Sequence, residues 1–250
     1  MKYRIPLVLA LSITPLPIAG AQSIHMPEIT SAPSLVSRCP DPSGTQANPV
    51  LVQVRSTLAE PEDARGRMRL QSLQDSLEGI LAVDPDRTED RYLLAVVLGG
   101  RSELAGGRGK LKWAGAMRAE AQQVLATDPD HPGANHLMGR LHAAVERMGR
   151  TKRFLARTLF DGEALAGASW ASAREHLARA ERDAPCQPEH HLELARLHQE
   201  LGEVRQAREE ARHVLELMGS EGAHSHLWRG AAALMERLSP PGHAGSSVDL

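Results

Sequence analysis

The stretch EHHLELARLHQELGEVRQA, residues 189–207, contains three histidines and four glutamates among its nineteen positions. Two interpretations compete: a metal site, or one segment of a repeated helical architecture whose packing positions happen to be histidine. The spacing of the histidines tests the first interpretation. The spacing of the small residues around them tests the second.

The spacing of the histidines argues against a metal site. His191 and His198 lie seven residues apart, which is about 10.5 Å along a helix axis, whereas helical metal pairs are three or four residues apart. His190 and Glu193 have usable spacing, but two ligands do not make a zinc site. We therefore expect no metal site and no cofactor, and predict that His191 and His198 fill partly buried packing positions. Spacings of five and six also exclude the upstream set of His131, His136 and His142.

Small residues around the stretch repeat with a fixed period. Ala173 and Ala207 are 34 residues apart, and so are Ala180 and Val214. A helix-turn-helix period of 34 residues is the signature of the tetratricopeptide repeat. Small side chains at these points let two helices approach closely. The chain departs from the repeat at His191 and at Ala211, where large aromatics are more usual, so looser packing is expected there.

The same helical pattern extends over most of the chain. Apolar residues recur three and four apart over about 50–238 without a convincing alternating strand. Aromatic residues make up only 3% of the chain, so the core must be built from Leu, Ala, Val and Met. The phrase Asp-Pro-Asp follows an apolar helix at 84–86 and again at 128–130, where proline would end the helix. The predicted fold is all-α, a right-handed tetratricopeptide-like helical repeat array (an α-solenoid) that ends in a helix around 223–238.

The ends of the chain have a different composition. Residues 1–21 read as a signal peptide, with Lys2 and Arg4 before an apolar run and Ala-Gly-Ala at its end. The alternative, a membrane anchor, is disfavoured because the run is short and contains three prolines, so no stable span is expected in the mature chain. Residues 22–49 are predicted to be a flexible Pro-rich arm, and 239–250 a disordered tail. We expect an exported protein, periplasmic if the source is bacterial and otherwise secreted.

Two cysteines, Cys39 in the arm and Cys186 in a predicted turn, remain after cleavage. In an oxidising compartment they can pair, which would staple the arm to the helical body. The alternative is two unpaired thiols. The sequence leaves both open, because it does not give the distance between the two Cα atoms.

One segment, residues 135–185, has an irregular repeat spacing. Ala173 comes 34 residues after Gly139, where a standard repeat would place it about 12 residues after, so roughly 22 residues that include RFLARTLF are inserted. This pattern resembles the regulator of microtubule dynamics protein family, over about residues 87–217. The resemblance implies a helical repeat fold, no catalysis and association with other macromolecules. An exported protein would not meet microtubules, so that connection is not carried over.

Two motifs that suggest enzymes fail in detail. The glycine-rich stretch 98–110 would need Gly at 104 and Ser or Thr at 111 to form a phosphate loop, but both positions are Leu. We predict a flexible interhelix loop there. Ser169 lacks the Gly-x-Ser-x-Gly elbow because position 171 is Ala, and it is predicted to lie at a helix N-terminus. The sequence thus predicts a protein that is not an enzyme.

The candidate binding residues follow from the repeat register. The first helix of each repeat would line an inner groove suited to an extended peptide or a helix. A formal net charge of -2 argues against nucleic acid. The expected partner is a protein or peptide, and the predicted groove residues are His136, Arg140, Leu192, Arg196 and Gln199.

A basic cluster in the insert offers a second surface, either for an acidic partner or as a solvated face. Its members are Arg147, Arg150, Lys152, Arg153 and Arg157. Two alternative functions stay open. One is a carrier of an apolar small molecule or lipid between the helices, suggested by the Ala/Leu-rich interior. The other is a metal-dependent enzyme.

Overall fold

The computed structural model describes residues 39, 48–59, 64–149, 167–219, 222 and 225–239. All of them belong to one unit, Ser34–Leu250. The predicted signal peptide lies outside the described residues, as do most of the predicted arm and all but the first residue of the predicted tail.

Helices occupy nearly all of the described ranges, and these ranges contain no strand. The prediction of an all-α fold is therefore confirmed for this part of the chain. Within it, no helix combines the length and the apolar character that crossing a bilayer requires. The helices are α1 (Pro49–Ala59), α2 (Ala64–Val83), α3 (Thr88–Leu104), α4 (Gly107–Thr127), α5 (Pro132–Arg147), α7 (Trp170–Asp183), α8 (Pro188–Glu200), α9 (Val204–Met218) and α10 (His226–Arg237).

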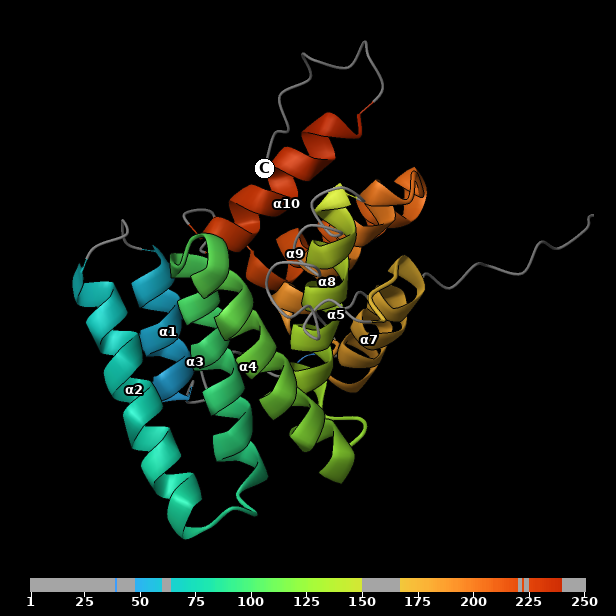
Figure 1. Cartoon of the computed structure of the whole chain (residues 1–250). Helices are drawn as coiled ribbons and strands as arrows, with labels where there is room; N and C mark the ends of the chain where they lie inside the picture. The colour runs from blue at the N-terminus through green and yellow to red at the C-terminus, as the bar shows by residue number, and fades with distance from the viewer. Residues whose placement is uncertain are drawn as a thin grey trace, which may run out of the picture. The chain divides into compact units, whose positions relative to one another are not determined.

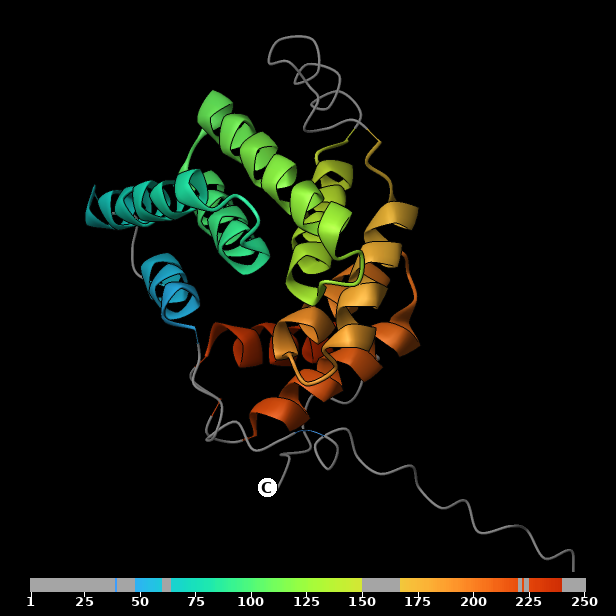
Figure 2. The ribbon, with the colours of Figure 1, turned by 90° about the horizontal axis from the view of Figure 1, so that it is seen from below.

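Three helical pairs carry most of the packing: α3 with α4, α5 with α7, and α8 with α9. Helices α1 and α2 pack on α3, and α10 packs on α9 and α8 (Figure 1). The first helices of successive pairs also meet, because α3 contacts α5 and α5 contacts α8 (Figure 2 gives a second view). Side chains from α3, α5 and α8 can therefore reach one another. We call the side of these helices on which Glu103, Arg140, Glu193 and Arg196 meet the first-helix face.

The helix ends follow the predicted turn chemistry. Helices α2, α4 and α7 each end just before a turn that contains Pro85, Pro129 or Pro185. Between α8 and α9, Gly202 has a φ of +74°, which favours glycine. Ser169 caps α7, and its hydroxyl accepts a hydrogen bond from the backbone N–H of Ser172 at 3.0 Å. The prediction of Ser169 at a helix N-terminus is confirmed.

Close contact between α5 and α7 depends on the absence of a side chain at Gly139. A Cβ added there would lie 2.5 Å from Cγ and 3.1 Å from the backbone N of Leu177. Leu177 and Ala173, on the facing side of α7, are both fully buried. The side chain of Leu177 thus occupies the space that any larger residue at position 139 would need.

Most of the glycine-rich stretch 98–110 is helical, so the prediction of a loop over this whole stretch was wrong; only residues 105 and 106 connect two helices. Helix α3 runs through it to Leu104 and α4 begins at Gly107. Gly100 faces the core, where an added Cβ would lie 3.3 Å from Val54 and 3.4 Å from Leu70. Packing of α3 against α1 and α2 outweighs the low helix propensity of glycine at this position.

A disulfide joins Cys39 to Cys186, with a Cα–Cα distance of 5.5 Å. Of the two alternatives that the sequence left open, the structure contains the bridge. Cys186 lies in the turn between α7 and α8. The 147-residue separation encloses most of the described helices, so the bridge restricts the unfolded chain over this whole span.

We predict that Gly139→Ala lowers the free energy of unfolding by about 1–3 kcal/mol, because the added methyl group overpacks the contact with Leu177. Gly79→Ala in α2 is the matched control. It meets nothing within 4 Å, so better helix propensity should stabilise the protein by about 0.5–1 kcal/mol. Denaturant unfolding measures both variants. Stabilisation by both would contradict the packing argument.

Candidate functional site

Charged side chains from three helices meet on the first-helix face. Arg140 of α5 donates to Glu103 of α3 at 2.8 Å and lies 3.6 Å from Glu193 of α8. Arg196, about one helical turn after Glu193 on α8, donates to the same Glu193 oxygen at 2.6 Å. The ion pairs therefore connect α3, α5 and α8 and fix where their guanidinium groups lie.

Glu193 is the buried centre of this network, with 6% of the residue exposed. A buried carboxylate is costly unless it is paired, and Arg140 and Arg196 supply the pairing. Desolvation opposes the charge of Arg140, but Glu193 and Glu103 raise the pKa of Arg140 above its ordinary value. The side chains of Arg140 and Arg196 remain 42% and 41% exposed, so both can still donate to a partner.

Two histidines extend the same face. Nδ1 of His136, on α5, lies 3.0 Å from Nδ1 of His190, on α8. Burial, followed by the neighbouring His190, lowers the pKa of His136 well below its ordinary value. Burial, followed by the charge of His191, lowers the pKa of His190 to about 4. Both rings are thus neutral at pH 7, and one can donate a hydrogen bond to the other.

The structure separates the five predicted groove residues. His136, Arg140, Arg196 and Gln199 are partly exposed. Leu192 is only 2% exposed and belongs to a core cluster with residues of α9 and α10, so its assignment as a partner contact is corrected. A Cβ added at Gly230 of α10 would lie 3.4 Å from Leu192 and from Arg196. Helix α10 therefore packs on this part of α8.

Sequence reasoning missed several polar residues of the face. Glu193 is three residues before Arg196, a spacing that favours an ion pair on one helix. That spacing was a usable signal. The contact of Glu103 with Arg140 and the ion pair of Arg55, on α1, with Glu189, on α8, arise from tertiary packing. No local pattern marks them.

A second polar cluster lies between α8 and α9. Nδ1 of His191 is 2.7 Å from Glu210, and its Nε2 is 2.7 Å from the Pro185 carbonyl oxygen. Burial opposes the charged ring, but these two hydrogen bonds raise the pKa of His191. His213 adds an edge-on ring contact with His191, with centroids 5.2 Å apart. His191 is 1% exposed, so it is fully rather than partly buried.

A third cluster joins α5 and α7. The rings of His142 and His176 stack with centroids 5.5 Å apart, and His176 bonds to the Asn135 side chain at 2.8 Å. Burial, followed by the charge of His176, lowers the pKa of His142 to about 4. Burial also lowers the pKa of His176. This neutral pair packs within the α5–α7 interface.

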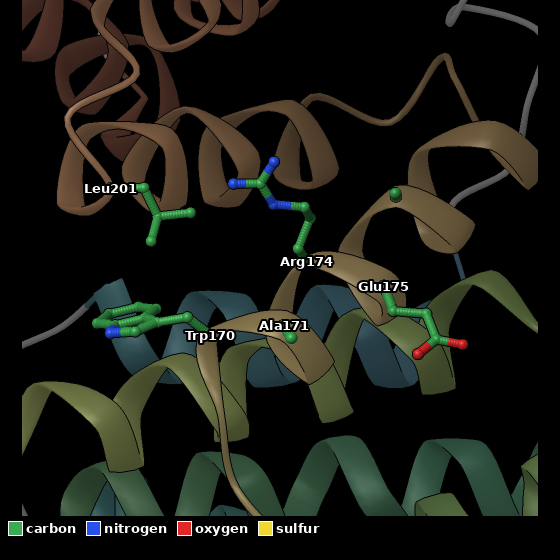
Figure 3. A pocket seen from close by; sticks show the side chains of 6 residues that line it. Trp170, Ala171, Arg174, Glu175 and Leu201 are labelled. Atoms are coloured by element: carbon green, nitrogen blue, oxygen red, sulfur yellow. The ribbon is translucent and has the colours of Figure 1, made fainter.

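A surface pocket of about 550 Å³ lies beside the start of α7 (Figure 3). Trp170 and Leu201 face each other across it, and Glu175 points away from them. Arg174 donates to Glu203, the residue just before α9, at 2.5 Å. None of the predicted groove residues borders the pocket, so it is separate from the first-helix face.

Only one member of the predicted basic cluster can be placed. Arg147, the last residue of α5, lies 3.2 Å from Glu200, the last residue of α8. This pairing partly neutralises its charge. The other four, Arg150, Lys152, Arg153 and Arg157, lie outside the described residues.

The family model for regulator of microtubule dynamics protein 1-3 matches residues 54–238. The chain belongs to this family. The family resemblance, expected over about residues 87–217, is thereby confirmed, and the match extends beyond this range in both directions. No similar sequence was found among curated proteins.

Among solved structures, this family member is similar to TTC0263, a thermophilic TPR protein of Thermus thermophilus. The two chains are 16% identical. The similarity covers 77% of this chain and 93% of that one, with a TM-score of 0.44.

Because the pKa of His142 is lowered to about 4, the unfolded chain binds more protons than the folded one between about pH 6.5 and 4. Stability contributed by this group is therefore lost as pH falls through that range. We predict that His142→Gln reduces the loss of stability between pH 7 and pH 5 by about 1–2 kcal/mol. The charged and titratable groups around the stacked pair are Arg118, Glu146, Glu175 and Arg179.

Thermal unfolding of both proteins at the two pH values measures this difference. The loss of stability from pH 7 to pH 5 is compared within each protein, which cancels any change that the substitution causes at pH 7. An equal loss of stability in the wild type and the variant would show that His142 is not held neutral by the fold.

Proposed function

We propose that this protein is an exported, non-catalytic helical-repeat scaffold that binds a protein or peptide partner through its first-helix face. The observation that carries the proposal is the network in which Arg140 and Arg196 are fixed by the buried Glu193 while about two fifths of each side chain stays exposed. Guanidinium groups held in place lose little entropy when they pair with a partner's carboxylate or carbonyl groups.

The arrangement of the repeats supports the same role. Successive first helices offer side chains of mixed character on one side: Arg140, His136 and Gln199 are all partly exposed there. Such a surface suits a peptide or helix that runs across several helices. Helix α10 already packs against Leu192 and Arg196, so the partner would bind the part of this face that α10 leaves exposed.

Export is part of the proposal and rests on the composition of residues 1–21. The disulfide between Cys39 and Cys186 fits an oxidising compartment. The family's name refers to microtubule dynamics. We do not extend that role to this chain, because an exported protein would meet a different set of partners.

Site-specific photo-crosslinking tests the proposal in the cells that make the protein. A photoreactive amino acid replaces Gln199, which the repeat register assigns to the first-helix face, or Arg205, which is exposed on the second helix of the same pair. We predict a protein-sized adduct from position 199 that is at least about fivefold more abundant than from position 205, since interface contacts concentrate on one patch.

Both substituted proteins should keep the wild-type melting temperature, which ensures that the comparison reports on contact. Equal labelling at the two positions would contradict binding through the first-helix face. An adduct with the mass of a lipid or other small molecule at position 199 would instead favour the alternative, a carrier of apolar ligands.

A further inference from the structure

Helices α8 and α9 bring together three side chains that can bind a metal ion. They are His191 of α8 and the pair Glu210 and His213 of α9, and one ligand atom from each lies within 4.8 Å of the others. Glu210 and His213 are three residues apart, so they share one face of α9. The packing of α8 on α9 supplies the third group, which no spacing within one helix could provide.

Two of the three distances between ligand atoms are close to those of a coordination shell, and the third, between the two histidines, is within 4.8 Å. Nδ1 of His191 lies 2.7 Å from Oε2 of Glu210, and that oxygen lies 3.8 Å from Nδ1 of His213. A tetrahedral zinc ion with bonds of about 2.0–2.2 Å holds its ligand atoms about 3.3 Å apart. Each observed distance differs from this value by about half an ångström, which small side-chain rotations can supply.

The surroundings orient His191 as a ligand. Its Nε2 lies 2.7 Å from the Pro185 carbonyl oxygen, which can only accept, so Nε2 carries a proton and Nδ1 is directed toward Glu210. Metal-bound histidines in proteins commonly donate their second ring N–H to such a carbonyl, which fixes the ring and its tautomer. The disulfide at Cys186 ties down the turn that presents this carbonyl.

His213 provides an independent observation. Its Nδ1 is buried and has no hydrogen-bond partner among the residues that the structure describes. A buried ring nitrogen without a partner is costly, and a ligand that fills the coordination position would remove that cost. The neighbouring Glu181 of α7 interacts electrostatically with all three groups and adds negative charge near them.

We propose that Nδ1 of His191, the carboxylate of Glu210 and Nδ1 of His213 bind one divalent transition-metal ion, with Zn²⁺ as the best-suited probe. Two imidazoles and one carboxylate suit zinc better than Ca²⁺ or Mg²⁺, which prefer oxygen ligands alone. The ion takes the place of the proton shared between His191 and Glu210. Three protein ligands leave a fourth position open to water, and the site links α8 to α9 independently of any protein partner.

Isothermal titration of the purified, disulfide-intact protein with Zn²⁺, after removal of metal by a chelator, tests this site. The wild type should bind one Zn²⁺ per chain at a high-affinity site and melt at a higher temperature with Zn²⁺ than without it. His213→Gln and Glu210→Gln should each weaken that site by at least about tenfold. His226→Gln, an exposed histidine of α10, is the matched control and should bind as the wild type does.

The comparison of His213→Gln with His226→Gln decides the result. The side chain of His213 is 21% exposed, so its replacement by Gln should leave the fold intact, as circular dichroism can verify. Equal Zn²⁺ affinity in these two variants, or no high-affinity binding by the wild type, would overturn the proposal. Neither outcome would affect partner binding through the first-helix face.

Discussion

The close approach of paired helices at small residues is the constraint on which the rest of the structure depends. In the pair α5–α7, the side chain of Leu177 fills the space beside Gly139, where an added Cβ would lie 2.5 Å from it. In the pair α8–α9, Ala195, Ala207 and Ala211 are completely buried at the contact. When both pairs close in this way, α5 and α8 come near enough for Arg140 to reach Glu193. The first-helix face is a consequence of tight pairing.

Histidines bring polar groups into the helical interfaces of this chain. His142 and His176 stack between α5 and α7, while His191 packs against His213 between α8 and α9. The two interfaces differ in charge. The first pair has lowered pKa values and packs as neutral rings, whereas His191 has a carboxylate partner in Glu210. This difference makes one cluster a packing element and the other a metal-site candidate.

Sequence reasoning could predict the helices and turns because local physics determines them. The 34-residue spacing from Ala173 to Ala207 corresponds to the step from α7 to α9, and Gly202 lies in the turn between α8 and α9. The error over 98–110 has a physical cause. The glycines favoured a loop, but Gly100 lies within α3 at a tight contact, where an added Cβ would be 3.3 Å from Val54 and 3.4 Å from Leu70. The low helix propensity of glycine predicted the wrong conformation for this stretch, because tertiary packing determines it.

The candidate sites were harder to predict because they combine residues from different helices. Register predicted that Arg140 and Arg196 share one face, and both contact Glu193. It could not show that Leu192 packs under α10. Histidine spacing near position 191 offered only pairs of metal ligands. Glu210 and His213 have helical ligand spacing that was overlooked, and only the packing of α9 on α8 brings them to His191.

A double-mutant cycle on Gly139 and Leu177 tests most directly whether close approach controls the pairing. Removing the leucine side chain vacates the space that a methyl group at position 139 would enter. Gly139→Ala should therefore cost at least about 1 kcal/mol less in the Leu177→Ala background than in the wild type, as measured by denaturant unfolding. Additive effects, within about 0.5 kcal/mol, would contradict the account.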